Sequence, residues 1–305
     1  MKIDKKKIEL RYGENPGQNA YLINKYNKSI FDFQINGKKI SYNNLLDLDS
    51  GLKCLNEFNE PTSIIVKHTN PCGAASADNI NSAFLKSYKS DPKSAFGGII
   101  FLNRKVNSTL AKKIFENFFE MVVAPNFDIS ALNILKKKKN LILLKKPNLK
   151  KEIISYRSTL FGELYQKNDL TPINKKFLNL VSTKVASLKS IEDLIFSLKI
   201  VKHLKSNAIV LSRNKQTLGL GHGQTNRVDA LKFAIRNMDL YFKRGFFVCT
   251  SDGFFPFKDS INLLNKNGCS VIAQPYGSIN DKEIISFSKK NKISLYFIKN
   301  RLFKH

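Results

Sequence analysis

The sequence has 305 residues, of which 42% are hydrophobic and 11% aromatic, which is typical of a globular chain with room for two domains and excludes a disordered one. No apolar run approaches the length of a membrane span, and the N-terminus lacks the apolar segment of a secretion signal, so we expect a cytoplasmic protein. The four cysteines form no C-x-x-C pair, which argues against a disulfide framework and a structural zinc site.

The charge balance is strongly basic, with 51 Lys and Arg against 24 Asp and Glu and a formal net charge of +27. One interpretation is a nucleic-acid-binding protein, because clustered cations gain from counterion release. The other is a lysine-rich surface spread over solvated faces. The sequence contains no RNA-recognition motif, arginine-rich arm or basic zipper, so we favour the second interpretation and keep nucleic-acid binding as the alternative.

In the first half, short apolar runs alternate with helical patterns. Residues 63–67 (SIIVK) are typical of a buried strand, and Asn70-Pro71-Cys72-Gly73 predicts a turn after it. A helix is expected over 77–88, with Ser76 or Asp78 as its N-cap. The remaining predicted elements are a strand at 97–103, a helix over 108–119, a strand at 121–125, a further helix and a strand at 140–144.

The second half repeats this rhythm. Its predicted elements are a helix over 190–204 with Ser190 and Asp193 at capping positions, strands at 207–212 and 216–221 around a turn at 213–215, helices over 225–238, 258–267 and 280–291, and strands at 245–250, 269–275 and 293–298. The alternation predicts a layered α/β architecture with helices covering the sheets. Because the halves echo each other, we expect a tandem duplication, with domains 1–160 and 161–305 and a boundary somewhere within 145–190.

Nine segments of the sequence resemble, in order and over essentially the whole chain, the AICAR transformylase domain of bifunctional purine-biosynthesis proteins. They are LRYGENPGQ (10–18), VKHTNPCG (66–73), DPKSAFGG (91–98), VVAP (122–125), KSNAIV (205–210), GLGHGQTNR (219–227), SDGFFPFKD (251–259), QPYGS (274–278) and the final RLFKH (301–305). The resemblance implies a duplicated cytidine-deaminase-like fold of layered α/β/α domains that lacks the zinc site.

The resemblance also implies a reaction, the transfer of a formyl group from 10-formyltetrahydrofolate to the 5-amino group of AICAR. That amine is a poor nucleophile, so the reaction needs a base to remove its proton and a cation to stabilise the developing oxyanion. By family analogy His68 is the proton acceptor and Lys67 the cation. Because neighbouring residues of a strand point to opposite faces, we expect the Asn70-Pro71 turn to break the strand so that both side chains reach one substrate.

The resemblance assigns binding roles residue by residue. The positions that correspond to AICAR contacts are Arg11, Tyr12, Gly97, Glu120, Asn207, Phe254 and Arg301. The positions that line the folate side are Arg227, Asp259, Ser278 and Ile279. Arginine suits phosphate or polar-ring recognition through forked hydrogen bonds, and Phe254 could stack on the imidazole ring.

The family also implies partners and cofactors. We expect 10-formyltetrahydrofolate as co-substrate, no metal, and a homodimer whose active sites are shared between subunits, with no membrane or specific nucleic-acid partner. Because the RYGENP motif already begins at Arg11, we expect a transformylase that stands alone, without IMP cyclohydrolase activity. An inactive remnant of the transformylase is a further alternative.

Two rival chemistries start from the same residues. A cysteine enzyme would pair Cys72 with His68, but Cys72 lies within the predicted turn. A zinc deaminase needs H-x-E and P-C-x-x-C, and here Ala75 stands in place of the second cysteine. The metal-ligand pattern is therefore absent from the sequence.

The sequence departs from the family pattern at four positions. His222 replaces a small residue and is expected to fill space near the folate side. Tyr276 stands in place of a glycine, Gly253 in place of an alanine and Gly17 in place of a histidine. Of the other histidines, we expect His203 to be structural and His305 to dock at the end of the chain.

Overall fold

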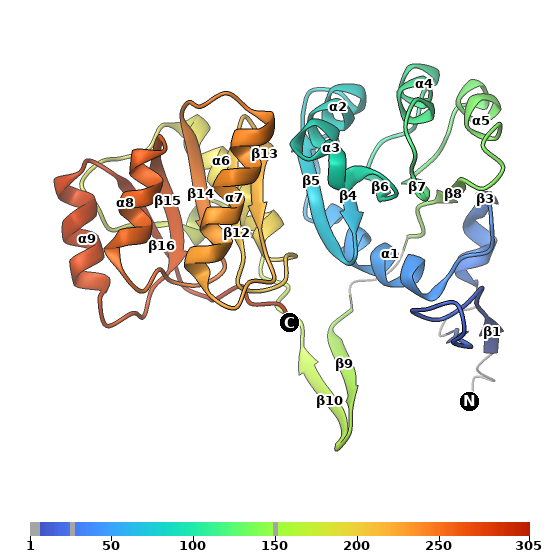
Figure 1. Ribbon diagram of the computed structural model, residues 1–305, viewed down its shortest axis with the longest axis horizontal. Helices are drawn as coiled ribbons and strands as arrows, with labels where there is room; N and C mark the ends of the chain where they lie inside the picture. Colours follow the sequence, from blue (N-terminus) through green and yellow to red (C-terminus); the bar gives the residue numbers. More distant parts are fainter. Residues whose placement is uncertain (1–6, 25–27, 149–151) are drawn as a thin grey trace.

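The computed structural model describes residues 7–24, 28–148 and 152–305 and is built around one mixed sheet of twelve strands (Figure 1). The first six residues of the expected first domain lie outside the described part. The order of strands across the sheet is β11-β16-β15-β14-β12-β13-β5-β4-β6-β7-β8-β3. The first half of the chain thus forms one side of the sheet and the second half the other, and the halves meet where β5 and β13 pair.

In the first half, β4 (Thr62–Lys67) pairs antiparallel with both β5 (Asn70–Ser76) and β6 (Ile99–Leu102), and β6, β7 and β8 run parallel. Apolar side chains on one face of each helix are buried against the strands. The other elements are β3 (Gln34–Asn36), α1 (Tyr42–Leu55), α2 (Ile80–Ser90), α3 (Pro92–Ala95), α4 (Ser108–Phe115), β7 (Met121–Ala124), α5 (Ile129–Leu135) and β8 (Ile142–Lys145).

In the second half, β12 (Ile209–Arg213) pairs antiparallel with both β13 (Gln216–Gly221) and β14 (Phe247–Ser251), and β14, β15 and β16 run parallel. The other elements are β11 (Asn179–Leu180), α6 (Leu188–Val201), α7 (Arg227–Tyr241), α8 (Lys258–Lys266), β15 (Cys269–Pro275), α9 (Asp281–Lys290) and β16 (Ser294–Ile298). The α/β class expected from the alternating pattern is confirmed.

Six shorter elements lie outside or at the margin of this sheet. Among them, β9 (Ile154–Thr159) and β10 (Gly162–Lys167) form a two-stranded hairpin that projects from the body near the C-terminal end of the chain (Figure 1). The others are β1 (Lys7–Glu9), β2 (Tyr21–Ile23) and the 3₁₀ turns Ile30–Phe33 and Lys175–Phe177. In the described part of the chain, every helix is too short or too polar to cross a bilayer.

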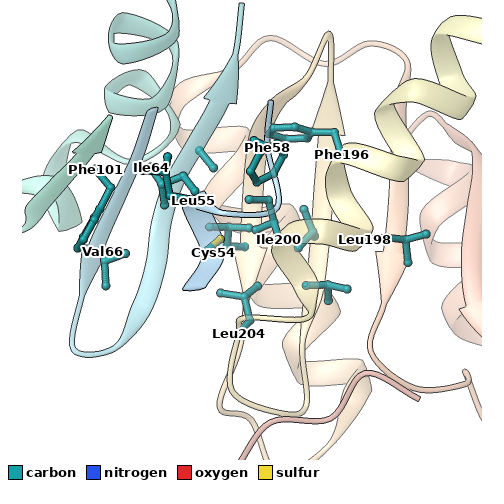
Figure 2. Close-up of a cluster of buried hydrophobic side chains, with 14 of the residues drawn as sticks. Cys54, Leu55, Phe58, Ile64, Val66, Phe101, Phe196, Leu198, Ile200 and Leu204 are labelled. Carbon is teal, nitrogen blue, oxygen red and sulfur yellow. The ribbon is translucent and has the colours of Figure 1, made fainter. Parts of the chain in front are cut away.

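The two faces of the sheet are packed differently. On one face, α1 and α6 contribute to a single apolar cluster that spans both halves, and the rings of Phe58 and Phe196 meet there with centroids 5.6 Å apart (Figure 2). On the other face there are two separate clusters, one under α2, α4 and α5 and one under α7, α8 and α9. The shared cluster therefore joins the halves, because burial of apolar surface is the main driving force for their association.

The seam between β5 and β13 is held by side chains as well as by backbone pairing. Its ladder contains one residue pair, Ala75 opposite Gln216. Beyond that pair the buried hydroxyl of Thr217 takes over, accepting from the Ala74 amide at 2.9 Å and donating to the Ala74 carbonyl at 3.1 Å. Ser90 Oγ also donates to the Thr217 carbonyl at 2.7 Å, which ties α2 to the seam.

The predicted turn at Asn70-Pro71-Cys72-Gly73 is wrong, because these residues begin strand β5. The strand tolerates proline at an irregularity in its register, where Val66 faces Pro71 and Ile65 faces Gly73 so that Cys72 is an extra residue. The reversal of the chain occurs earlier, at the two-residue turn formed by His68 and Thr69.

Two predicted helix starts are also wrong. Asn79, and not Ser76 or Asp78, caps α2, because its side chain accepts from the Ser82 amide. Ser187 caps α6, and its hydroxyl accepts from the Ser190 amide at 3.2 Å. The other predicted strands and helices between 97 and 298 are confirmed to within a few residues, whereas α1 and the β9–β10 hairpin were not predicted.

Helices α2 and α7 lie against the sheet backbone at glycines of β5 and β13. A Cβ atom on Gly73 would lie 2.1 Å from the Ser87 carbonyl oxygen, and one on Gly219 would lie 2.0 Å from the Ala234 carbonyl oxygen. These distances are far below van der Waals contact, and the obstructing atoms belong to helix backbone that has no rotamer to change. Glycine at each position therefore sets how closely the helix approaches its strand.

We predict that Gly219→Ala destabilises the protein by about 1–3 kcal/mol, because α7 must move away from β13 to admit the methyl group. Gly17→Ala is the matched control, since no atom lies within 4 Å of a Cβ placed there. The measurement is the free energy of unfolding in urea for both variants. Equal stabilities for the two variants would contradict the close approach of α7.

Candidate active site

Lys67 and His68 lie at the tip of the β4–β5 hairpin. Lys67 is the last residue of β4 and faces Asn70, while His68 and Thr69 form the turn with φ of +51° and +64°. Two-residue turns with positive φ at both positions match the twist of antiparallel strands, although residues other than glycine adopt them at a cost. The His68 side chain is exposed and Lys67 is partly exposed.

The turn is fastened to α1. The Thr69 amide donates to Asp47 Oδ1, and Ser50 Oγ donates to the Thr69 carbonyl. Asn70 Nδ2 donates to the His68 carbonyl at 2.9 Å. Burial raises the pKa of the Asp47 carboxyl, and the amides of Thr69 and His68 together with the His68 side chain oppose that rise. These contacts fix the backbone of the turn relative to the helix.

Lys67 is held beside Gly97 and Glu120 at the same edge of the sheet. Its Nζ donates to the Phe96 carbonyl at 2.7 Å. Gly97 follows with φ of +73°, a left-handed conformation that favours glycine, and the Glu120 amide donates to the Gly98 carbonyl at 3.0 Å. The starts of β6 and β7 thus bring together three residues of the expected site, Lys67, Gly97 and Glu120.

Glu120 has a cationic partner that the sequence did not indicate. Lys38 Nζ lies 2.6 Å from Glu120 Oε2, and both side chains are about a quarter exposed. Since this pair remains in contact with water, its contribution to stability is small. The ion pair with Lys38 and the backbone hydrogen bond from Glu120 to Gly98 hold this carboxylate at the sheet edge.

Arg11 and Tyr12 form a pair near the start of α1. Arg11 Nη2 donates to the Tyr12 hydroxyl at 2.7 Å, and the guanidinium lies 4.5 Å from the centroid of the Tyr12 ring. The backbone of the pair is joined to residues 40–42, because the Arg11 amide donates to Ile40 and the Tyr42 amide donates to Tyr12. Arg11 Nε is buried without a hydrogen-bond partner, so one donor of this guanidinium is unused.

A second group is centred on Asp252, which is completely buried just after β14. Asp252 Oδ1 accepts from Arg227 Nη2 at 2.8 Å and Oδ2 accepts from Ser206 Oγ at 2.6 Å. Arg227 Nη1 also donates to the Phe254 carbonyl at 3.1 Å, and the Asp252 carbonyl accepts from the Leu302 amide at 2.9 Å. A charged hydrogen-bonded pair buried in this way holds several loops together.

Arg301, Phe254 and Asn207 belong to this second group. The Arg301 guanidinium lies 5.1 Å from the centroid of Phe254 and 5.7 Å from that of Phe303. Such stacking orients a guanidinium and leaves its edge donors available. The side-chain nitrogen of Asn207, Nδ2, donates to the Gln224 carbonyl at 2.9 Å, so the side-chain oxygen of Asn207 points away from Gln224.

Two of the residues expected on the folate side, Ser278 and Ile279, lie on the loop after β15, which touches the loop after β14. Asn280 Nδ2 donates to the Pro256 carbonyl at 2.7 Å, and the Asn280 amide donates to Ser278 Oγ at 3.2 Å. These bonds join the loop after β15 to the loop after β14. Asp259 is exposed in the first turn of α8, and the Ile279 side chain is fully exposed.

Direct contacts connect the β4–β5 hairpin to the second group. The Lys205 amide donates to Asn70 Oδ1 at 3.0 Å. Lys304 Nζ donates to Ser50 Oγ at 3.2 Å and to the His203 carbonyl at 3.0 Å, and burial lowers the pKa of this lysine. The end of the chain therefore packs against α1, the helix that also holds the His68 turn.

The hydrogen bonds and ring contacts of the described residues place the expected site residues in separate groups along one edge of the sheet. These contacts bring together Lys67, Gly97 and Glu120 beside the His68 turn, Arg11 with Tyr12, and Arg227 and Arg301 with Phe254. Asn207 lies just before β12, and Asp259, Ser278 and Ile279 lie on the segments that follow β14 and β15.

Sequence reasoning missed Asp47, Ser50, Asp252 and Lys304, which hold these groups in place. Asp252 and Lys304 lie inside the recognised segments SDGFFPFKD and RLFKH, so a buried structural role for them could have been considered. Asp47 and Ser50 lie on α1, a helix that was not predicted.

Cys72 is poorly suited to the rival cysteine chemistry. Its thiol contacts the Ile65 carbonyl at 3.5 Å, and burial raises its pKa to about 12. The thiolate needed for nucleophilic attack is therefore scarce at neutral pH. In residues 7–24, 28–148 and 152–305, no three His, Cys, Asp or Glu side chains gather where they could hold a metal ion.

His222 lines a cavity of about 290 Å³ together with Cys72, Asp91 and Phe233. Burial lowers the pKa of its imidazole. This cavity lies where the two halves meet, beside the β5–β13 seam. None of the residues expected to bind folate lines it.

The remaining departures from the family pattern have simple structural settings. A Cβ on Gly253 would lie 2.4 Å from Arg227 Nη2, so glycine fits the present position of the Arg227 guanidinium. Gly17 has open space around it, and the Tyr276 side chain is about half exposed. His203 is buried with its Nε2 3.4 Å from Glu57 Oε1, just beyond the end of α6.

Comparisons with known proteins agree on one family. The family model described as AICARFT/IMPCHase bienzyme matches residues 1–237. The bifunctional purine biosynthesis protein PurH of Caldicellulosiruptor bescii is 45% identical over 97% of this chain, and that of Fusobacterium nucleatum is 44% identical over 99%. PurH of Buchnera aphidicola subsp. Baizongia pistaciae is 43% identical over 99% of the chain.

The chain spans about 59% of the length of these curated relatives. The matched span covers nearly the whole chain. A family model covering more than half of the sequence and relatives well above 40% identity lead to the same conclusion. The chain belongs to the AICARFT/IMPCHase bienzyme family.

Proposed function

We propose that this protein transfers the formyl group of 10-formyltetrahydrofolate to the 5-amino group of AICAR, giving FAICAR and tetrahydrofolate in purine biosynthesis. The observation that carries this proposal is the Lys67–His68 pair, held on a fixed turn at a sheet edge in a chain of the AICARFT/IMPCHase family. Formyl transfer assayed with purified protein and both substrates tests it directly.

The chemistry requires a base, a cation and precise placement of two substrates. The amine nitrogen forms a bond to the formyl carbon while the bond from that carbon to the folate nitrogen breaks. One proton leaves the amine, and one must reach the departing folate nitrogen. His68 accepts the first proton, and Lys67 stabilises the oxyanion or assists the departing nitrogen.

The geometry of the turn supports a joint role for these two residues. On a continuous strand Lys67 and His68 would point to opposite faces. Here Lys67 ends β4, and His68 begins a turn with positive φ, so the alternation stops between them. The Lys67 ammonium is anchored by the Phe96 carbonyl and keeps further donors for an anionic oxygen.

We assign AICAR to the edge formed by Gly97, Glu120, Asn207 and the arginines 11 and 301. Arg301 stacks on Phe254 and has edge donors free to bind phosphate, and Arg11 has an unused buried Nε. The high positive charge of the chain attracts a phosphorylated substrate to such an edge.

We assign folate to the loops after β14 and β15, with Asp259, Ser278 and Ile279 in direct contact. Ile279 offers a fully exposed apolar side chain for a pterin or benzoyl ring. Arg227 has two nitrogens engaged by Asp252 and Phe254, so its main part in this proposal is to hold the Phe254 loop. No catalytic step is assigned to a metal, and a cytoplasmic location stays a prediction.

We further propose that the two halves are copies of one deaminase-like unit, with domains 1–160 and 161–305. The support is that each half has the same order of corresponding strands across the sheet and the same parallel and antiparallel pairs. In addition, the first residues of α1 and α6 are as far apart in the sequence as their last residues are. The boundary at 160 falls in the turn of the β9–β10 hairpin.

We also propose a homodimer with shared active sites, in which the β9–β10 hairpin contacts the second subunit. Leu160 and Phe161 at its tip are fully exposed, and Leu164 and Tyr165 are about two-thirds exposed. Isolated two-stranded hairpins are marginally stable in water, and exposed apolar groups of this kind mark interfaces. A two-fold axis would bury both copies of the hairpin in the same way.

Among residues 7–24, 28–148 and 152–305, no structural feature favours the nucleic-acid alternative. The same formyl-transfer assay separates an active enzyme from an inactive remnant, and salt-dependent DNA or RNA binding measured alongside it tests the alternative.

We predict that His68→Ala lowers kcat by roughly 10²–10⁴-fold while AICAR affinity changes only a few-fold, because the general base is lost. Asn214→Ala is the matched control, since Asn214 occupies the same position in the β12–β13 turn with φ of +54°. Steady-state kinetics and calorimetric titration with AICAR give the two quantities. A kcat near that of wild type in His68→Ala would remove His68 from the mechanism.

Lys67→Met is expected to lower kcat by a factor similar to that of His68→Ala, because the oxyanion then lacks its cation. Lys67→Arg keeps the charge but delivers it through a planar fork, so it should restore only part of the activity. The comparison is made by kcat at saturating substrates. Full activity in Lys67→Met would show that the charge plays no part in the chemical step.

For the dimer we predict that Phe161→Asp shifts the protein from dimer to monomer and lowers formyl transfer with it. The control is Ile129→Asp, which introduces the same charge at a residue that is 80% exposed on α5 and distant in sequence from the hairpin. Sedimentation velocity measures the assembly of both variants. A fully active monomer, or an unaltered dimer in Phe161→Asp, would reject the shared site formed through this hairpin.

A further inference from the structure

The chain contains two tight turns of the same kind, one in each half. His68 and Thr69 have φ of +51° and +64°, and Asn214 and Lys215 have φ of +54° and +51°. Each turn joins the first two antiparallel strands of its half, β4 to β5 and β12 to β13. The two turns lie at opposite edges of the sheet, since β4 and β12 run in opposite directions.

An aspartate from the preceding helix holds each turn. In α1, Asp47 accepts from the Thr69 amide, and in α6, Asp193 accepts from the amides of Asn214 at 3.0 Å and Lys215 at 2.6 Å. The separation in sequence between Asp47 and Asp193 equals that between His68 and Asn214, so the two aspartates occupy equivalent positions relative to their turns. Burial raises the pKa of both carboxyls, and the amides of the turn oppose that rise in each.

The two aspartates differ in the side chains that face them. The charges that act on Asp193 come from Lys189 on its own helix and Lys215 in the turn, whereas the charge that acts on Asp47 comes from His68. Asp47 therefore performs the backbone task of Asp193 and, because it accepts from the amide of the residue that follows His68, also places a negative charge near that histidine. A carboxylate beside an imidazole can fix the orientation of the ring and stabilise its protonated form.

We propose that Asp47 is a positioning residue for His68: it fixes the turn that carries His68 and supports the imidazole when it has taken the substrate proton. The inference rests on the proposed formyl transfer. Asp193 performs only the structural part of this task, because the Asn214–Lys215 turn carries no residue of the candidate site.

The experiment compares Asp47→Asn with Asp193→Asn, which remove one negative charge from equivalent positions. We expect similar decreases in melting temperature for the two variants. We expect kcat to fall by about 10–100-fold in Asp47→Asn, with AICAR affinity nearly unchanged, because a displaced base is costly even when binding is intact. In Asp193→Asn, kcat should stay within about twofold of wild type.

A kcat in Asp47→Asn equal to that in Asp193→Asn overturns the inference. If Asp47→Asn does not fold, Asp47→Glu is compared with Asp193→Glu. Each of these changes keeps the carboxylate acceptor but displaces it by one methylene. A lower kcat in Asp47→Glu than in Asp193→Glu supports the inference, and an equal kcat overturns it. Hydrogen exchange at the Thr69 amide supplies a reading that needs no activity. Exchange should be faster in Asp47→Asn than in wild type or Asp193→Asn, and equal rates overturn the inference.

Wild-type protein without formyl transfer would instead refute the proposed function. In that case the exchange rates still decide whether Asp47 holds the turn, so the two failures are distinguishable.

Discussion

The contact between the two halves of the sheet is the constraint on which the candidate site depends. The ladder across the seam contains the single pair Ala75 and Gln216, the Ser76 amide donates to the Lys215 carbonyl, and the Thr217 hydroxyl supplies the next bonds. Such a seam would be weak without the apolar cluster beneath α1 and α6, where side chains of both halves mix. Because the Asn70 amide oxygen reaches across to Lys205, the position of the hairpin relative to Asn207 follows from this packing. The site is therefore a product of tertiary packing more than of any one loop.

The buried polar groups have a related part in the architecture. Asp252 joins Arg227, Ser206 and the backbone of Leu302, and these come from three distant parts of the chain. Removing one partner of a buried charged pair is costly, because the remaining charge has no water to replace it. The loops that carry Phe254 and Arg301 are thereby kept in one arrangement. Pre-organisation of this kind lowers the cost of binding.

Periodicity in the sequence was sufficient to predict most strands and helices after residue 97, because their apolar faces are buried in regular alternation. It failed for α1, where Gly51 interrupts the helical pattern for a tertiary reason: a Cβ there would lie 2.2 Å from the Phe101 ring. It also failed at Pro71, since only the register of β5 shows that proline is accommodated in a strand. The exposed hairpin at 154–167 has no buried face to give it a pattern. Motifs nominated the candidate site residues, whereas their grouping and the bond from the Thr69 amide to Asp47 required the fold.

The turn at Asn214 and Lys215 has a consequence for protein engineering. It already has the left-handed backbone, the buried acid of Asp193 and a basic residue, Arg213, in the position that corresponds to Lys67. Changing two side chains, Arg213→Lys and Asn214→His, would place a lysine–histidine pair on a second hairpin whose turn is held by an aspartate, at the opposite edge of the sheet. That edge is a ready scaffold on which a designer could build a new acid–base centre without altering the backbone.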